Sequence, residues 1–271
     1  MKARYYLALV FLLGVGRAVA SDPAKVTEAV NVVEHGHQDS SATSPAPVGT
    51  LIQDGEFVET GKSSRAEMLL PSSSIARMGS NSIFNYSVDS NTINLQSGTI
   101  LFCKPKEAKQ LNMMTAAVTA AIVGTTGFVS VHGTGKSHTY IFGIIEGHAS
   151  AQANGKSIPV GPGQILEFRP GSPPVVFSFD VPRLVRTSIF FTGFKHPLPN
   201  QDEVDSEVSS YLDDERRGFI QPPSHSVDYS GGIPTLTTTA YDSASNAQNQ
   251  PGNTPPPQQR TPTNYNTYGG R

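Results

Sequence analysis

The chain is poor in cysteine, tryptophan and charged residues. It contains one cysteine and no tryptophan, and only 15% of its 271 residues are charged. Cys103 has no second cysteine with which to form an intramolecular disulfide, so disulfides do not stabilise this fold. It lies in the apolar segment TILFCKP, which predicts a buried structural thiol.

Motifs of catalysis are also missing. The chain has neither Gly-x-Ser-x-Gly nor His-Glu-x-x-His, and a single cysteine excludes Cys-x-x-Cys. Residues 161–173, GPGQILEFRPGSP, are similar to the second motif of cupin barrels but lack its metal-binding histidine. The acids of the central region occur singly, so the sequence favours no carboxylate pair, although folding could bring two together. We predict a protein that is not an enzyme and holds no metal or cofactor.

Residues 133–137, GTGKS, resemble part of a phosphate-binding loop. The complete motif needs a glycine five residues before Gly135, where this chain has Ser130. The segments on both sides, GFVSVH and TYIFGIIEG, have the composition of strands, whereas a phosphate loop leads into a helix. The stretch therefore predicts the turn of a β-hairpin, and no nucleotide is expected to bind.

The first residues, MKARYYLALVFLLGVGRAVA, have the features of a secretory signal peptide. Lys2 and Arg4 precede an apolar run, and small residues before Ser21 suit cleavage after Ala20. Neither this run nor any later one reaches the roughly 18 apolar residues of a membrane-spanning helix. We predict residues 1–20 as a signal peptide, and a periplasmic or extracellular protein with no transmembrane segment after cleavage.

Removal of the signal peptide affects the charge balance. It takes away Lys2, Arg4 and Arg17 and no acid, so the formal net charge goes from −2 to −5. This acidic balance argues against nucleic acid and anionic membranes as partners.

Residues 48–194 have the pattern of an all-β domain. Short runs rich in Ile, Val, Phe and Thr are separated about every 8–12 residues by Gly and Asn/Ser/Asp clusters. Lys106–Ile122 is the one stretch whose propensities favour a helix, although its second half runs directly into Val-Gly-Thr, which favours a strand.

The flanking segments differ in character. Residues 21–47 are polar and predict a flexible leader with one short helix at DPAKVTEAVNVVE; a solvated pair is the interpretation favoured for His35 and His37 in it. Residues 195–218 predict a linker and an amphipathic helix, since Val204, Val208, Tyr211 and Leu212 recur at helical spacing. Residues 219–271 are rich in Pro, Asn, Gln and Ser and predict a disordered tail.

A series of short motifs crosses the β region in a characteristic order. It comprises Gly55, Thr60-Gly61, Ser64-Arg65-Ala66-Glu67, Leu69, Arg77, Gly79, Asn81-Ser82, Phe84, Leu95, Gly98, Ile100, Phe102, Gly124-Thr125, Phe128, Glu146-Gly147 and Gly163-Gln164. This order resembles the FecR-domain family, the periplasmic domain of ferric-citrate-type regulators, from about Leu51 to Phe168. The resemblance implies an all-β fold of short strands in a solenoid-like or sandwich arrangement.

The sequence departs from the family in two ways. Val123 stands where the family usually has an arginine before Gly-Thr. A predicted signal peptide stands where the regulators have a cytoplasmic sigma-controlling region and a transmembrane helix. The resemblance therefore implies the fold, here as a stand-alone exported domain, and not sigma-factor signalling.

Three charged residues are candidates for a binding site. Arg65 and Glu67 alternate along one strand and share a face, and Arg77 follows in the next predicted strand. Cross-strand pairing is favoured over a ligand site for them. For Phe84 and Tyr86, a core position is favoured over stacking on sugars.

Three functional hypotheses follow. The main one is a non-catalytic binding or assembly module of the cell envelope, whose partner is an envelope protein or a polysaccharide. The first alternative is a sensor or signalling partner of an envelope transporter or regulator, acting through strand addition. The second alternative is a carbohydrate-active β enzyme.

Overall fold

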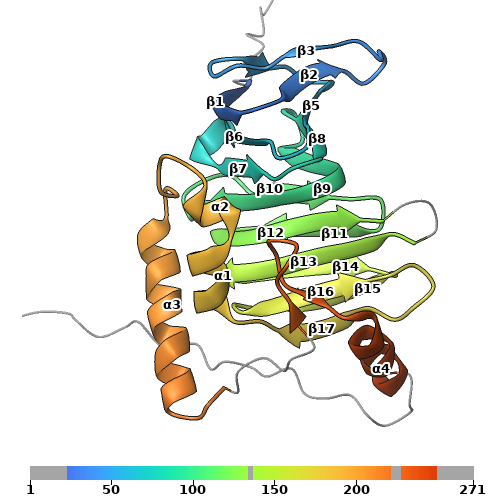
Figure 1. The fold of residues 1–271 in the computed structure, drawn as a ribbon, viewed down its shortest axis with the longest axis vertical. Coiled ribbons are helices and arrows are strands. Elements are labelled where there is room, and N and C mark those ends of the chain that lie inside the picture. Colours follow the sequence, from blue (N-terminus) through green and yellow to red (C-terminus); the bar gives the residue numbers. More distant parts are fainter. Residues whose placement is uncertain (1–22, 134–136, 221–226, 249–271) are drawn as a thin grey trace, which may run out of the picture.

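The computed structural model describes residues 23–133, 137–220 and 227–248, and most of these residues form β-strands. Seventeen strands belong to one hydrogen-bonded network, which folds into two layers that we call sheet A and sheet B. Figure 1 shows the strands stacked from β3 at the top to β17 at the bottom. The predicted all-β, solenoid-like or sandwich architecture is confirmed.

Sheet A is antiparallel throughout. Its strands are, in spatial order, β4 (Leu51–Ile52), β1 (Ala24–Val30), β6 (Arg65–Leu69), β7 (Ile75–Met78), the second half of β9 (Thr92–Lys104), β12 (Thr125–His132), β13 (Thr139–Glu146), β16 (Gln164–Phe168) and β17 (Val175–Ser178). A short 3-10 helix, η1 (Pro71–Ser73), lies between β6 and β7.

Sheet B forms the second layer and packs against the face of sheet A that the helices do not cover. Its strands are, in spatial order, β3 (Thr43–Pro45), β2 (Val33–His37), β5 (Glu56–Thr60), β8 (Ile83–Ser87), the first half of β9, β10 (Leu111–Met114), β11 (Val118–Ile122), β14 (Ala149–Ala153) and β15 (Lys156–Val160). Only the β9–β10 pairing is parallel among the strand pairs of the described residues.

Strand β9 passes from sheet B to sheet A at Gly98. The residues before it pair with β8, and the residues after it pair with β7 and β12. Gly98 has φ +83°, and a Cβ there would lie 2.2 Å from the Ser82 Oγ. Because Ser82, the residue before β8, is this close and φ is positive, only glycine suits the crossing.

Two apolar cores follow from the alternation of the strands. Side chains such as Phe84, Tyr86 and Phe102 point between the sheets and are buried there, as predicted for the first two. A second core, which includes Phe128 and Ile145, lies between sheet A and the helices. Burial of each such side chain stabilises the fold by roughly 1.5–3 kcal/mol.

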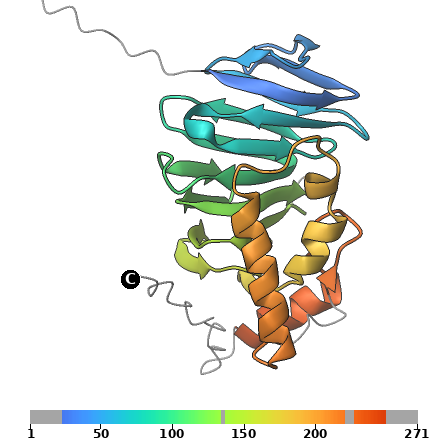
Figure 2. The same ribbon diagram turned by 90° about the vertical axis from the view of Figure 1, so that its left-hand side faces the viewer.

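Three helices cover the outer face of sheet A, as Figures 1 and 2 show: α1 (Val181–Thr187), α2 (Ile189–Thr192) and α3 (Gln201–Arg216). We call residues 181–217 the strap. The predicted amphipathic helix is thus confirmed as α3, which buries Val204 and Tyr211, although Leu212 remains 43% exposed. Helices α1 and α2 lie inside residues 48–194, which were predicted to be all-β, and α2 replaces a strand expected in the run TSIFFTGF.

The N-terminal segment corrects the predicted leader. Residues of the expected short helix form strand β1, and His35 and His37 lie in strand β2 rather than in a loose segment. The β domain therefore begins at Ala24 and not at residue 48. This segment forms strands because β1 pairs with β6 and β2 pairs with β5. These tertiary contacts override the weak helical propensity of the segment.

Two further expectations are corrected and one is confirmed. Lys106–Ile122 contains strands β10 and β11 and no helix. Part of the predicted tail forms the hairpin β18 (Val227–Asp228) and β19 (Thr235–Leu236) and the helix α4 (Thr238–Gln248), while residues 249–271 lie outside the described residues. The predicted hairpin does join β12 to β13 through the glycine-rich stretch, of which residues 134–136 lie outside the described residues.

The predicted signal peptide also lies outside the described residues. Among the helices that the structure describes, none combines the length and apolar character needed to cross a bilayer.

Candidate functional site: a polar seam between the strap and sheet A

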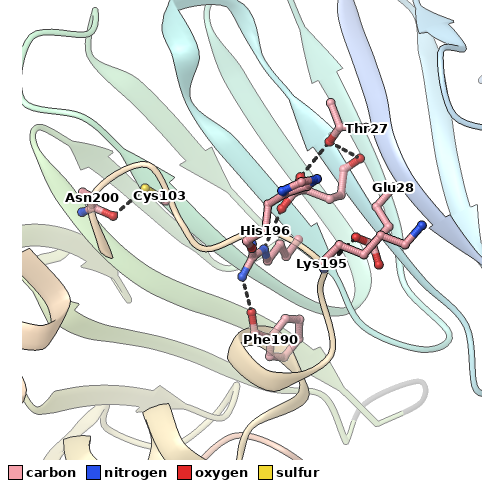
Figure 3. Close-up of polar contacts among 9 residues, drawn as sticks. Thr27, Glu28, Cys103, Phe190, Lys195, His196 and Asn200 are labelled. Atoms are coloured by element: carbon pink, nitrogen blue, oxygen red, sulfur yellow. Dashed lines mark hydrogen bonds and ion pairs between the residues drawn. The ribbon is translucent and has the colours of Figure 1, made fainter. Parts of the chain in front are cut away.

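The strap is attached to sheet A through a line of buried and part-buried polar groups, which Figure 3 shows in part. We call this line the polar seam. Its sheet members are Thr27, Glu28, Glu67, Arg77, Cys103, Thr126 and Glu146, and its strap members are Phe190, Lys195, His196 and Asn200.

Arg77 of β7 is the centre of the seam. Its side chain is only 1% exposed, and its Nε donates to the Oε2 of Glu67 over 2.8 Å. Its two terminal nitrogens donate to the backbone carbonyls of Phe190 (2.7 Å) and His196 (2.5 Å). Arg77 thus joins sheet A to two points of the strap, with the planar fork geometry that lysine lacks.

The predicted binding candidates Arg65, Glu67 and Arg77 come together on this face of sheet A. Glu67 lies directly opposite Arg77 in the β6–β7 register and also accepts from the Thr27 hydroxyl over 2.9 Å. The guanidinium groups of Arg77 and Arg65 lie over the Phe194 ring, 4.6 and 5.7 Å from its centroid. The three side chains therefore hold the strap in this structure, and the Arg65 Nε remains buried without a hydrogen-bond partner.

Glu28 of β1 is a seam residue that the sequence did not reveal. Its carboxylate accepts a hydrogen bond from the backbone N–H of Lys195 over 3.0 Å. The expectation of a flexible leader concealed it, because a residue outside the β domain would have no reason to contact the strap.

Asn200 attaches the strap a second time, immediately before α3. Its carboxamide oxygen accepts from the Cys103 thiol over 2.8 Å. Its amide nitrogen donates to the Thr126 Oγ1 over 2.6 Å and to the Glu146 Oε2 over 3.2 Å. One side chain of the strap thus pairs three buried groups from β9, β12 and β13.

Burial controls the ionisation of this second attachment point. It raises the pKa of the Cys103 thiol to about 11, so the thiol stays protonated at neutral pH. Burial also raises the pKa of Glu146 above its ordinary value. Cys103 is buried, as predicted, and a protonated, buried thiol is a poor nucleophile.

The central part of the chain matches a known protein family. Residues 56–150 match the protein-family model described as FecR protein. The chain contains a FecR domain. The match confirms the resemblance expected from the sequence and covers about a third of the chain.

Structure comparison gives a weaker likeness. A protein described as "a putative anti-sigma factor" from Parabacteroides distasonis ATCC 8503 is similar in two crystal structures, at 1.65 and 2.50 Å resolution. Each is 9% identical, with a TM-score of 0.41, and the match covers 45% of this chain and 59% of the other. The present chain therefore matches less than two thirds of that protein. No curated protein matches the chain.

The FecR domain supplies most of the sheet side of the seam. Glu67, Arg77, Cys103 and Glu146 lie inside residues 56–150, whereas the strap lies wholly outside them. The strands β15, β16 and β17 also continue the sheets beyond the FecR domain. The seam is thus the place where the FecR domain contacts the following, C-terminal part of the chain.

A separate group of polar contacts, outside the polar seam, lies at the lower end of the sheets. The fully buried Glu167 pairs with Arg169 over 2.7 Å and accepts from the backbone N–H of Leu236. Arg169 lies over the Tyr241 ring at 4.0 Å, and the Tyr241 hydroxyl donates to the Pro173 carbonyl. These contacts attach β19 and α4 to the sheets.

His35 and His37 of β2 have a carboxylate neighbour that the sequence did not predict. The Glu56 Oε1 lies 3.5 Å from the His35 Nδ1 and 3.8 Å from the His37 Nε2. Within the described ranges, no three His, Cys, Asp or Glu side chains form a group that could hold a metal ion. The two histidines and the carboxylate form a polar cluster at the upper end of sheet B.

A serine–histidine contact occurs on β12 of the FecR domain. The Ser130 Oγ lies 2.6 Å from the His132 Nε2 and 2.5 Å from the Thr99 Oγ1, and it donates to the Gly98 carbonyl. Ser130 is fully buried, so a substrate would not reach its hydroxyl. Burial lowers the pKa of His132, which favours the neutral ring. The contact fits a role in joining β9 to β12.

Proposed function

We propose that this protein is a non-catalytic regulatory module of the cell envelope that senses a protein partner through the strap-covered face of its FecR domain. The polar seam is the observation that carries this proposal. It attaches the strap through three side chains, Glu28, Arg77 and Asn200, and through backbone groups of the strap at Phe190, Lys195 and His196. Together with the apolar core beneath it, the seam holds the strap docked in this structure. In the proposed function, a partner shifts the population from this docked state to a released one.

Release of the strap would uncover an apolar surface. Phe128, Ile141 and Ile165 of sheet A belong to the core that the strap covers, together with Leu184 and Val204 of the strap itself. An exposed apolar patch of this kind is typical of a protein-binding surface. A partner that binds this face more tightly than the strap does would therefore leave the strap displaced.

The sheet edges are less suitable for a partner, although the sensor hypothesis drawn from the sequence assigned binding to strand addition. The edge strands of sheet B contain Pro45 in β3 and Pro159 in β15, and proline on an edge strand turns its missing N–H toward the open side. In sheet A, β4 has two residues, and β17 packs against α4 and β19. Such features are the usual protection against strand addition.

Site-specific cross-linking in cells that produce the protein tests the proposal. A photoreactive residue at the exposed strap position Leu212 is expected to capture an envelope transporter or regulator component. The same residue at the exposed position Asn246 of α4, away from the strap, is the matched control. Cross-links from Leu212 alone support the proposal, whereas identical products from both positions, or none from either, would overturn it.

The broader role of a binding or assembly module is the second candidate. The observation that favours it is the outer face of sheet B, on which no helix of the described residues packs (Figures 1 and 2). Recovery of no transporter or regulator from envelope extracts, together with retention on a polysaccharide, would favour this role over sensing. Hydrolysis of a glycan or an ester in a broad substrate panel would instead support the enzyme hypothesis.

The proposed location, periplasmic or extracellular, rests on the signal peptide predicted from the sequence. Fractionation of producing cells, with the mass of the mature chain, tests it. A chain that begins at Ser21 in the exported fraction is expected, and an uncleaved chain in the cytoplasm would contradict it.

A further inference from the structure

The outer face of sheet B from β8 to β15 carries two regular rows of side chains. The strand registers align Asn85, Asn94, Met114, Thr119, Gln152 and Ser157 in the first row, and Ser87, Thr92, Asn112, Ala121, Ser150 and Pro159 in the second. These positions are half-buried or exposed, whereas residues between them along the strands, such as Phe84, Ile93 and Met113, are buried. Both rows therefore point away from the core.

The rows are polar but carry no charge. Nine of the twelve side chains are amides or hydroxyls, and none is acidic or basic. The charged residues of this face, Glu34 and Glu59, lie further up the sheet on β2 and β5, and both are acids. The two acids would repel an anionic polymer that lies on this face. The rows themselves offer no counter-charge to a cationic one.

The composition of the rows suits sugars better than a protein surface. Amide and hydroxyl groups both donate and accept hydrogen bonds, as sugar hydroxyls require, and they recur here at the roughly 4.8 Å spacing of adjacent strands. A protein interface would need an aromatic or apolar centre, for which Met114, Ala121 and Pro159 are too small and scattered.

The upper end of the first row adds two features that point to a ligand. Phe57 of β5 lies directly opposite Asn85, and its half-buried ring offers an apolar surface beside the amides. The Asn85 Oδ1 has no hydrogen-bond partner in the described structure and is shielded from water. An unpaired, buried acceptor costs free energy. If the Asn85 side chain turned outward, a ligand hydroxyl that donates to its Oδ1 would recover this cost.

We propose that this face binds an uncharged polysaccharide, with the glycan chain lying across the strands along the two rows. This inference does not rest on the sensing function proposed for the strap, because the two surfaces are on opposite layers of the protein. The rows would supply hydrogen bonds at repeated intervals, and Phe57 would contact one sugar ring.

Affinity electrophoresis of the full chain tests the proposal directly. Native gels containing dextran, laminarin or glucomannan are expected to retard the protein, and a gel containing the anionic polymer alginate is not. Thr119→Glu with Gln152→Glu places two charges in the middle of the first row, at exposed positions, and is expected to weaken retention at least tenfold.

The matched control is Ser206→Glu with Asn246→Glu, which adds the same charge at exposed positions on α3 and α4. It is expected to retain full binding. Three results would overturn the proposal: no retardation by any of the three neutral polymers, equal retention of the two double variants, or equal retardation by alginate. A concentration-dependent dimer that the row variant abolishes, without glycan binding, would assign the face to a second copy of the chain.

Discussion

Arg77 of β7 and Glu67 of β6 lie directly opposite each other in sheet A, and their 2.8 Å ion pair is buried under the strap. The pair leaves two guanidinium nitrogens free of the carboxylate, and both donate to carbonyls of the strap. A single arginine is therefore responsible both for a cross-strand contact within the FecR domain and for the attachment of the C-terminal part of the chain.

Arg77→Met is expected to lower the free energy of unfolding by about 3–5 kcal/mol, because it leaves the Glu67 carboxylate buried without its partner. Urea unfolding followed by circular dichroism measures this change. The control Arg216→Met removes an arginine whose ion pair with Asp213 is exposed, and it is expected to cost less than about 1 kcal/mol.

A companion variant separates loss of charge pairing from loss of packing. Arg77→Met combined with Glu67→Gln is expected to be more stable than Arg77→Met alone, since no unpaired charge remains in the seam. Similar costs for Arg77→Met and Arg216→Met would show that the seam does not hold the strap.

Glu146 gives the seam a dependence on pH. Because burial raises its pKa above 4.5, the folded protein holds this proton at pH values where the unfolded chain has released it. The free energy of unfolding contributed by this group therefore falls as pH rises from the ordinary pKa to the raised one, by at most about 1.4 kcal/mol per pH unit. Glu146→Gln is expected to remove this fall and to be the more stable protein at pH 7–8.

Urea unfolding of both proteins between pH 4 and 8 checks this prediction. The difference in unfolding free energy should grow with pH above 4.5 and then level off. Asp242→Asn, at an exposed position of α4, is the control and should follow the parent at every pH. A constant difference between Glu146→Gln and the parent across the range would contradict it.

The features that the sequence predicted correctly are those with a local pattern. The glycine-rich stretch after His132 joins two strand-like runs, so the β12–β13 hairpin could be predicted from neighbouring residues alone. Helix α3 has its apolar residues at helical spacing, Asp202 and Glu203 lie in its first turn, and Arg216 lies in its last, as a helix dipole favours. The order of short motifs in the β region was likewise sufficient to indicate the FecR domain.

The features that it missed depend on residues far apart in the chain. The segment 24–37 has weak helical propensity, but its pairing with β5 and β6 decides its structure. Arg77 reaches carbonyls 113 and 119 residues away, and Asn200 reaches Cys103 across 97 residues. A lone Glu28 or Asn200 has no surrounding motif, so a sequence alone offers no signal for its place in the seam.

The thiol of Cys103 reports whether the seam is closed. Its pKa of about 11 and its burial predict that it reacts with a disulfide reagent at pH 8 at least about 100-fold more slowly in the folded protein than in urea. Asn200→Ala removes its hydrogen-bond partner and the strap contact, and the thiol of this variant is expected to react faster than that of the parent. Absorbance of the released chromophore measures both rates, and equal rates for Asn200→Ala and the parent would show that Asn200 does not close the seam.

The two glycines Gly98 and Gly155 separate backbone strain from crowding, since both have positive φ, +83° and +71°. A Cβ on Gly98 would lie 2.2 Å from the Ser82 Oγ and 2.4 Å from the Ser82 Cα, whereas a Cβ on Gly155 would meet nothing within 4 Å. Gly155→Ala is expected to cost only the strain of a left-handed residue, about 1–2 kcal/mol. Gly98→Ala adds overpacking at the point where β9 changes sheets and is expected to cost about 2–5 kcal/mol in total. Urea unfolding measures both costs, and an equal cost for the two substitutions would show that β9 does not need a close approach to Ser82 in order to cross between the sheets.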